Sequence, residues 1–125
     1  MPDCSVCIGG GDYDGPNEFE NVEWPKARKT HKCGECRRIV AAGERYERFA
    51  GKFDGSLFCL KTCAQCAEIR DAFNCEGGAI VDGLWSEIES YVFPNMTTGC
   101  LERLETPEAK AYLLQQWRKW KGLMA

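Results

Sequence analysis

The spacing of apolar residues along this chain changes from a strand-like pattern in the middle to a helical pattern towards the C-terminus. "RRIV" (37–40), "RYERFAG" (45–51) and "SLFCLK" (56–61) are rich in residue types that strands favour. The Asp-Gly pair in "FDGS" marks a turn between the last two segments. The pattern therefore predicts a short strand followed by a β-hairpin.

A helix is predicted directly after the hairpin. "KTCAQCAEIRDAF" (61–73) places Ile69 and Phe73 four residues apart, so both side chains would lie on one face of a helix. Thr62 has the short polar side chain of an N-cap, and we expect the helix to begin there.

Two further helices are predicted in the remaining chain. "DGLWSEIESYV" (82–92) begins at a capping residue, Asp82, and Pro94 would end it. The last helix (106–122) would begin with Thr106 as its cap. The apolar sides of these helices would consist of Leu84, Ile88 and Tyr91 in the first and of Leu113, Trp117 and Trp120 in the second.

A chain of 125 residues has the size of one small domain. Residues 1–25 are predicted to form an irregular acidic arm, because "GGGDYDGPNE" is dense in turn formers and has no periodicity. Residues 26–75 would form a central module, and residues 76–125 a helical extension packed on it. The expected fold class is α+β. Neither a secretory signal nor an apolar run that could cross a bilayer is visible, so we expect no membrane association and a cytoplasmic location.

The central module is bracketed by two Cys-x-x-Cys pairs, Cys33/Cys36 and Cys63/Cys66, separated by 26 residues. Four thiolates are the ligands of a closed, tetrahedral zinc site. Cys33 and Cys36 would lie in a tight knuckle, and Cys63 and Cys66 would point the same way from the first turn of the helix. Knuckle, hairpin and ligand-bearing helix, in this order, are typical of a treble-clef or zinc-ribbon-like module.

Other uses of these cysteines are alternatives to zinc. An iron–sulfur cluster or disulfides would use the same residues, and His31 could replace one cysteine as a ligand. A reducing cytosol favours metal binding over disulfides. Redox catalysis is disfavoured, because no βαβ pattern surrounds either motif. Zinc is therefore the cofactor that we expect.

The other cysteines suggest a second zinc site that would hold the acidic arm in place. Its expected ligands are Cys4, Cys7, Cys75 and Cys100. His31 and Cys59 are the alternatives for the fourth ligand. Alternatively, Cys59 and Cys100 are small buried hydrophobic residues, which is the interpretation we favour for Cys59 inside "SLFCLK".

The sequence argues against an enzyme. Nucleases built on treble-clef modules use paired histidines, and this chain contains one histidine. The spacing of a zinc deaminase is absent, and two complete cysteine pairs leave no open coordination position. No phosphate-binding or dinucleotide-binding glycine motif is present, and no small-molecule substrate is evident. We expect no catalytic residues.

Charge is segregated along the chain, although the net charge is only −3. Residues 24–66 carry a net charge of +6, whereas residues 1–23 and 67–105 carry −6 each. A run of bases could neutralise phosphates and predicts a nucleic-acid surface as an alternative function. Its residues are Lys26, Arg28, Lys29, Lys32, Arg37 and Arg38. The mixed charge favours a protein partner as the main hypothesis.

The block "ARKTHKCGECRRIVAAGERYERFAGKFDGSLFCLKTCAQC" (27–66) resembles a family of small, uncharacterised phage and prophage proteins. The resemblance extends to the N-terminal Cys-x-x-Cys, to "MTTGC" (96–100) and to "WRKWKGL" (117–123). It implies a phage-encoded metal-binding protein that acts in the cytoplasm of a bacterial host. It implies no established activity, and an inhibitor of host machinery, including host defence, is the function that we expect from it.

Overall fold

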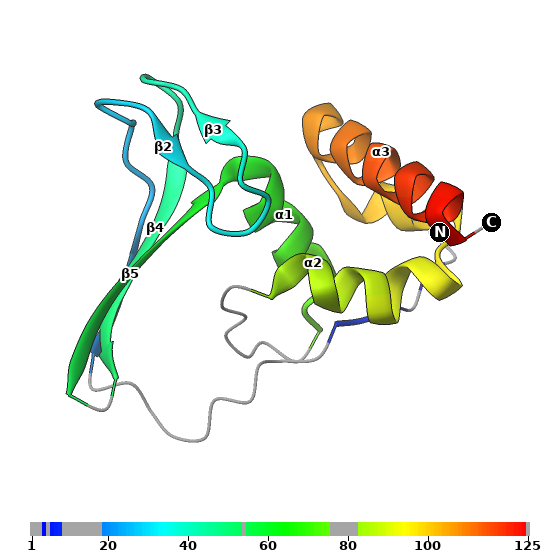
Figure 1. Cartoon of the computed structure of the whole chain (residues 1–125), viewed down its shortest axis with the longest axis horizontal. Helices are drawn as coiled ribbons and strands as arrows, with labels where there is room; N and C mark the ends of the chain where they lie inside the picture. Colours follow the sequence, from blue (N-terminus) through cyan, green and yellow to red (C-terminus); the bar gives the residue numbers. More distant parts are fainter. Residues whose placement is uncertain (1–3, 5, 9–18, 54, 76–82, 125) are drawn as a thin grey trace.

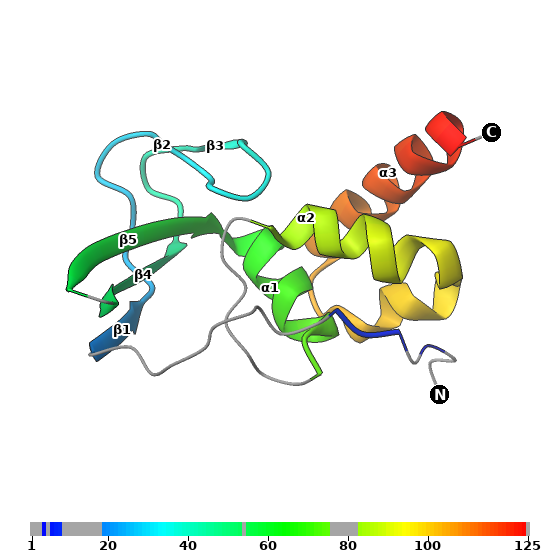
Figure 2. The ribbon, with the colours of Figure 1, turned by 60° about the horizontal axis from the view of Figure 1, so that its bottom comes forward.

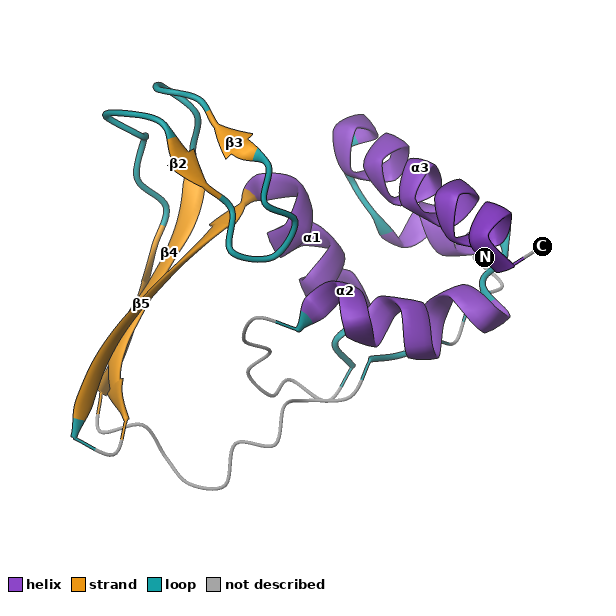
Figure 3. Ribbon diagram, in the orientation of Figure 1, coloured by secondary structure: helices purple, strands orange, loops and turns teal. Residues whose placement is uncertain are grey.

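The computed structural model describes residues 4, 6–8, 19–53, 55–75 and 83–124. The fold is α+β, as the sequence predicted. Strands gather at one end of the molecule and helices at the other (Figures 1 and 3). The predicted capping residue Asp82 lies outside the described residues.

The predicted hairpin is confirmed and forms two neighbouring strands of the larger sheet. Tyr46, at the start of one hairpin strand, pairs with Cys63, at the end of the other. Gly55 at the turn has a φ of 79°, a left-handed conformation that glycine adopts without strain. The sheet has three antiparallel strands in the order β1 (Phe19–Glu23), β4 (Tyr46–Phe53) and β5 (Ser56–Cys63).

Strand β1 falls inside the segment predicted as an irregular arm, and that prediction was wrong for Phe19–Glu23. Val22 pairs with Phe49 of β4, and Glu23 pairs with Arg48. The Arg48 Nη1 atom lies 3.6 Å from the Glu23 Oε2 atom. The five residues of β1 carry little strand signal of their own. The strand forms because it pairs with β4, which lies far along the chain.

A second, two-stranded sheet carries the knuckle. It is formed by β2 (His31–Lys32) and β3 (Ile39–Val40), which are antiparallel. Between them the chain turns back through two backbone hydrogen bonds, from Cys33 N to Arg38 O at 2.8 Å and from Arg37 N to Cys33 O at 3.0 Å. Arg37 completes the turn with a φ of 66°.

Helix α1 (Ala64–Phe73) follows β5 without a loop. Its N-cap is Cys63, whose sulfur accepts a hydrogen bond from Cys66 N at 3.5 Å. The prediction that Thr62 caps this helix was wrong, because extended backbone continues through Thr62 to the end of β5. The shift places one metal-ligand candidate at the cap and another in the first turn.

The C-terminal part is helical, but its first segment differs from the prediction. Leu84 and Ile88 are buried as expected, whereas Tyr91 is 57% exposed and Val92 is buried instead. The reason is a π-helical turn, in which Phe93 N bonds to Ile88 O five residues back. The elements are α2 (Leu84–Glu87), η1 (Ile88–Val92), η2 (Phe93–Asn95), η3 (Thr98–Arg103) and α3 (Pro107–Met124).

The last helix begins where it was predicted. Thr106 caps α3, because its Oγ1 atom accepts a hydrogen bond from Ala109 N at 3.3 Å. Leu113 is fully buried, and Trp117 and Trp120 pack partly buried against the core, so the predicted apolar side is confirmed.

The hydrophobic core lies between α1 and the C-terminal helices, and Figure 2 shows α1 between the sheet and those helices. Ile69 and Phe73 of α1 are fully buried in it, as predicted. Ile8 of the N-terminal segment is also buried, and its N atom bonds to Phe73 O at 2.9 Å. In the described part of the chain, no helix combines the length and apolar character needed to cross a membrane.

Candidate metal centre

Four cysteine sulfurs meet where the knuckle, the hairpin and α1 join. Cys33 and Cys36 come from the turn between β2 and β3, Cys63 ends β5, and Cys66 lies in the first turn of α1. All four sulfurs lie within 4.8 Å of one another. Cys33, Cys63 and Cys66 are buried, and Cys36 is half-buried. We call these four residues the central cluster; the sequence predicted this set of ligands, and the structure brings it together.

The spacing of the sulfurs fits one tetrahedrally coordinated ion. Metal–sulfur bonds of about 2.3 Å at tetrahedral angles place the sulfurs about 3.8 Å apart. The Cys36 and Cys63 sulfurs are 3.7 Å apart. That distance is far longer than a disulfide bond of about 2.05 Å. The central cluster can therefore hold a metal ion in its centre.

Backbone N–H groups point at the sulfurs of the cluster. Cys33 Sγ accepts hydrogen bonds from Glu35 N at 3.4 Å and from Cys63 N at 3.3 Å. Gly34 N bonds to Lys61 O at 2.8 Å, which fixes the knuckle on β5. Such donors stabilise negative sulfur and orient each ligand towards the metal.

Two aromatic side chains from the C-terminal half contact the cluster, and the sequence did not predict them. Trp85 Nε1 donates a hydrogen bond to Cys66 Sγ at 3.4 Å. Tyr112 of α3 packs edge-on against Trp85, with ring centroids 5.4 Å apart. Burial and a hydrogen bond with the Cys36 thiol raise the pKa of Tyr112. The helical extension therefore packs against the cluster through these two side chains.

In the absence of a cation, each of the four thiols changes the pKa of its neighbours. Hydrogen bonds from Cys36, Cys63 and Cys66 lower the pKa of Cys33. Hydrogen bonding to Cys33 and Cys36 raises the pKa of Cys63 and of Cys66. Four sulfurs this close cannot all ionise without a positive charge among them. A divalent cation supplies that charge and allows every sulfur to act as a thiolate ligand.

Arg38 adds a fixed positive charge beside the cluster. Its Nη2 atom donates to Glu44 Oε2 at 3.1 Å and to Gln65 Oε1 at 2.9 Å. Hydrogen bonding to Glu44, followed by interaction with Cys63, raises the pKa of Arg38. Arg38 therefore connects the knuckle to Glu44 and to Gln65 of α1, and its part in a nucleic-acid surface stays a prediction.

His31 and Cys59 lie away from the central cluster. The His31 ring packs 5.1 Å from the Tyr46 ring, and its Nδ1 atom is 3.1 Å from Lys61 Nζ. Loss of water contact, with the charges of Lys61 and Lys29, lowers the pKa of His31. Cys59 on β5 is exposed, so the interpretation of Cys59 as a buried hydrophobic residue was wrong; outward-facing positions alternate along a strand.

The four cysteines predicted for a second zinc site are brought together in the structure as two disulfides. Cys4 is bonded to Cys100, and Cys7 to Cys75. We call these four residues the arm quartet. In this oxidised form their sulfurs are not thiolate ligands, so the second zinc site stays a prediction for the reduced chain.

The predicted basic run is largely solvent-exposed. Lys26, Arg28, Lys29, Lys32 and Arg37 are all exposed, in contrast to half-buried Arg38. These bases are therefore accessible around β2 and the knuckle, and their binding to nucleic acid stays a prediction.

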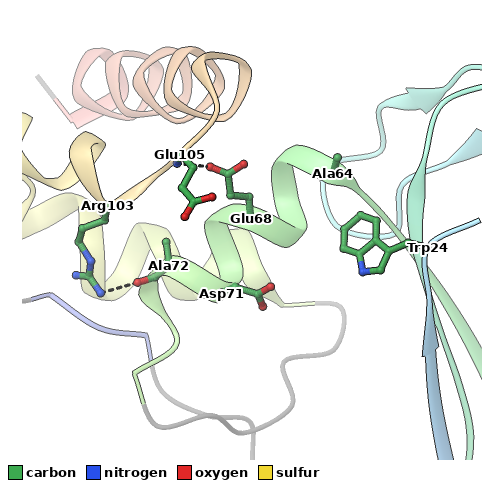
Figure 4. Close-up of a pocket in the computed structure, with 7 residues that line it drawn as sticks. All are labelled: Trp24, Ala64, Glu68, Asp71, Ala72, Arg103 and Glu105. Atoms are coloured by element: carbon green, nitrogen blue, oxygen red, sulfur yellow. Dashed lines mark hydrogen bonds between the residues drawn. The ribbon is translucent and has the colours of Figure 1, made fainter.

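A pocket of about 470 Å³ opens beside α1 (Figure 4). Trp24 lines one side, while Glu68, Asp71 and Glu105 place carboxylates around it. Glu68 accepts hydrogen bonds from Glu105 N at 2.7 Å and from Thr106 N at 3.0 Å, so it holds the start of α3. Arg103 also lines the pocket, so three carboxylates face one guanidinium group, and this net negative lining is unfavourable for phosphate groups.

Comparisons with protein-family models, with curated proteins and with solved structures find no match to this chain. Its function must therefore be argued from the cluster and the surfaces around it.

Proposed function

We propose that this chain is a non-catalytic zinc-binding protein that docks on another protein. The observation that carries the proposal is the central cluster: four sulfurs, three of them buried, spaced for one tetrahedral ion. Thiolates select soft or borderline metals, and a closed tetrahedral set of four sulfurs is typical of structural zinc. The order knuckle, hairpin and helix supports a treble-clef-like module.

The closed coordination supports a structural role for the metal. A catalytic zinc ion keeps one position for water or substrate, whereas the four cysteines of the central cluster fill a tetrahedron. Trp85 and Tyr112 cover the cluster from the helical side. Zinc would thus join the knuckle, the hairpin and the helix at one point, in addition to the hydrogen bonds between them.

The docking surface that we propose is one face of the larger sheet. Residues paired across strands share a face, and side chains alternate between faces along each strand. Arg48 pairs with Lys61, and Lys52 pairs with Leu57, four positions away along each strand. These four residues therefore lie on one side, which we call the basic face. Leu57 is 76% exposed there.

An acidic protein surface with an apolar contact is the partner that complements this face. The segment 24–66 carries a net charge of +6, in contrast to the rest of the chain. Figures 1 and 2 show the β4–β5 hairpin extending away from the helices, which makes it accessible to a partner. The resemblance to phage and prophage proteins supports a host or phage protein as partner, with inhibition of host machinery as the result.

Metal analysis tests the zinc proposal. We expect the purified chain to retain zinc at the central cluster, and we expect Cys36→Ser to lose that zinc. Cys59→Ser is the matched control, because Cys59 is an exposed thiol on the same hairpin. A chain that folds and stays stable after complete chelation would contradict a structural zinc ion.

Capture from host lysate, with matched variants, tests the docking proposal. We expect a bound protein to be lost when Arg48 and Lys61 are changed to Glu, and to be retained by Lys119→Glu, which reverses a charge on α3. Nuclease treatment should leave the capture unchanged. The same proteins bound by all variants would contradict a role for the basic face.

A nucleic-acid adaptor is the second candidate function, favoured by the exposed bases around the knuckle. Changing Lys29, Lys32 and Arg37 to Glu should then abolish salt-dependent retention on DNA or RNA. No retention of the unaltered chain at low salt would exclude this candidate. The acidic pocket beside exposed Trp24 favours the protein partner, because base stacking there would bring phosphates near three carboxylates.

A further inference from the structure

The two disulfides of the arm quartet lie against a single guanidinium group. Arg103 Nη1 donates to Cys4 Sγ, and Arg103 Nη2 donates to Cys75 Sγ, each at 3.6 Å. Cys4 is bonded to Cys100, and Cys75 to Cys7. One sulfur of each disulfide therefore contacts the same guanidinium group, although the four cysteines come from three separate parts of the chain.

Contacts other than the disulfides hold this arrangement. Arg103 Nη1 also donates to Val6 O and Nη2 to Ala72 O, both at 2.6 Å. The Arg103 guanidinium carbon lies 4.6 Å from the centre of the Phe73 ring. Ile8 is buried in the core, with its backbone bonded to Phe73. Because these contacts do not need sulfur–sulfur bonds, they keep the cysteines near one another after reduction.

We propose that the reduced arm quartet is a second zinc site, and that the two disulfides are its oxidised form. Cys4 and Cys7 supply a Cys-x-x-Cys pair, and Cys75 and Cys100 supply the other ligands. A zinc ion with four thiolates carries a net charge of −2, and Arg103 offers two N–H groups and a positive charge to the sulfurs. The site is separate from the central cluster and does not depend on it.

The two forms interconvert by a balanced reaction with a peroxide. Two peroxide molecules oxidise four zinc-bound thiolates, each peroxide accepting two electrons as its O–O bond breaks. Four protons are taken up, two S–S bonds form, and the zinc ion and four water molecules are released. The reverse reaction needs a dithiol reductant and free zinc.

In both forms the N-terminal arm stays attached to the body of the protein. Each disulfide joins an arm cysteine to one further along the chain, with sequence separations of 96 and 68 residues. Zinc would join the same segments through one ion. Oxidation therefore replaces the cross-link through one zinc ion by two disulfide cross-links and releases that zinc ion. The central cluster keeps its own ion.

Zinc counting on the full-length chain tests the proposal. We expect two zinc ions per chain after purification under reducing conditions with zinc, and one after titration with hydrogen peroxide. Cys75→Ala should bind one zinc ion in the reduced state, because it leaves the central cluster intact, and Cys59→Ser should still bind two. A reduced wild-type chain that binds only one zinc ion would overturn the proposal, as would a peroxide-treated chain that keeps two.

Thiol alkylation followed by mass spectrometry gives an independent readout that does not depend on how a variant folds. In the reduced wild-type chain, zinc should slow the alkylation of Cys4, Cys7, Cys75 and Cys100, and chelation should restore it. Equal alkylation rates at these four cysteines with and without zinc would also overturn the second site. A failure of zinc binding at the central cluster would give a different result, because it would change the alkylation rates of Cys33 and Cys66.

Discussion

The central cluster and the arm quartet each gather four cysteines, but different forces bring them together. The sulfurs of the central cluster come from a knuckle, a strand end and a helix start that adjoin in the folded sheet. Those of the arm quartet come from an N-terminal segment, from the residues directly after α1 and from η3, joined across 96 and 68 residues. Regular secondary structure positions the ligands of the central cluster, whereas the hydrogen bonds of Arg103, the burial of Ile8 and the cross-links themselves position the cysteines of the arm quartet.

Removal of one ligand from the central cluster should have the largest effect. Structural zinc contributes about 10–16 kcal/mol in small modules, which is comparable to the whole stability of a domain. We therefore expect Cys63→Ser to lose the cooperative unfolding of the sheet, as measured by circular dichroism. Cys59→Ser, on the same strand, should change the free energy of unfolding by less than about 0.5 kcal/mol. An unchanged melting curve for Cys63→Ser would remove the distinction between the two groups of cysteines.

Removal of one disulfide should have a smaller effect on a different part of the molecule. Loss of a cross-link that closes a loop of 68 residues should lower the free energy of unfolding by about 4 kcal/mol. We expect this for Cys7→Ser combined with Cys75→Ser in the oxidised chain, measured by urea denaturation. The central zinc content should stay the same. Simultaneous loss of that zinc would show that the two regions do not fold separately.

The buried ion pair between the sheet and α1 tests how the metal-bearing half is joined to the helices. Glu47 of β4 is 5% exposed, and Arg70 Nη1 donates to its Oε1 atom at 2.6 Å. Glu47→Gln should cost about 3 kcal/mol, because Arg70 would keep a buried charge with fewer partners. Glu44→Gln is the control, since its pair with Arg38 is solvent-accessible and should contribute less than about 1 kcal/mol. An equal loss of unfolding free energy in both variants would contradict a special role for the buried Glu47–Arg70 pair.

A pH-dependent contact between α1 and α3 should have the smallest effect. Burial alone would raise the pKa of Glu68, but hydrogen bonds from Thr106 and Glu105 outweigh it, so the pKa is lowered. A lowered pKa in the folded state stabilises the protein above the ordinary pKa of about 4.3. That stabilisation is lost as the pH falls through the folded pKa.

Glu68→Gln should therefore destabilise the chain by about 1 kcal/mol at neutral pH and by less in acid, as measured by denaturant titration. Ala109→Gly would report a general weakening of α3 without this pH dependence. A cost of Glu68→Gln that is the same at both pH values would show that charge does not contribute.

The sequence predicted the central cluster because its signals are local. Two Cys-x-x-Cys pairs, a hairpin between them and a helix after them occupy one continuous segment. Trp85 and Tyr112 could not be predicted as neighbours of the sulfurs, since their positions depend on how distant helices pack. The disulfide pairing within the arm quartet could not be predicted either, because four cysteines allow three connectivities. Tyr91 was misplaced because a π-helical turn alters the helical periodicity.

The hydrogen bond from Trp85 to Cys66 has a practical consequence. Metal coordination draws electron density from the sulfur, so the indole that donates to this sulfur should change its fluorescence when the ion enters or leaves. The chain therefore carries an intrinsic optical probe, and metal exchange at the central cluster can be followed in real time without an added dye.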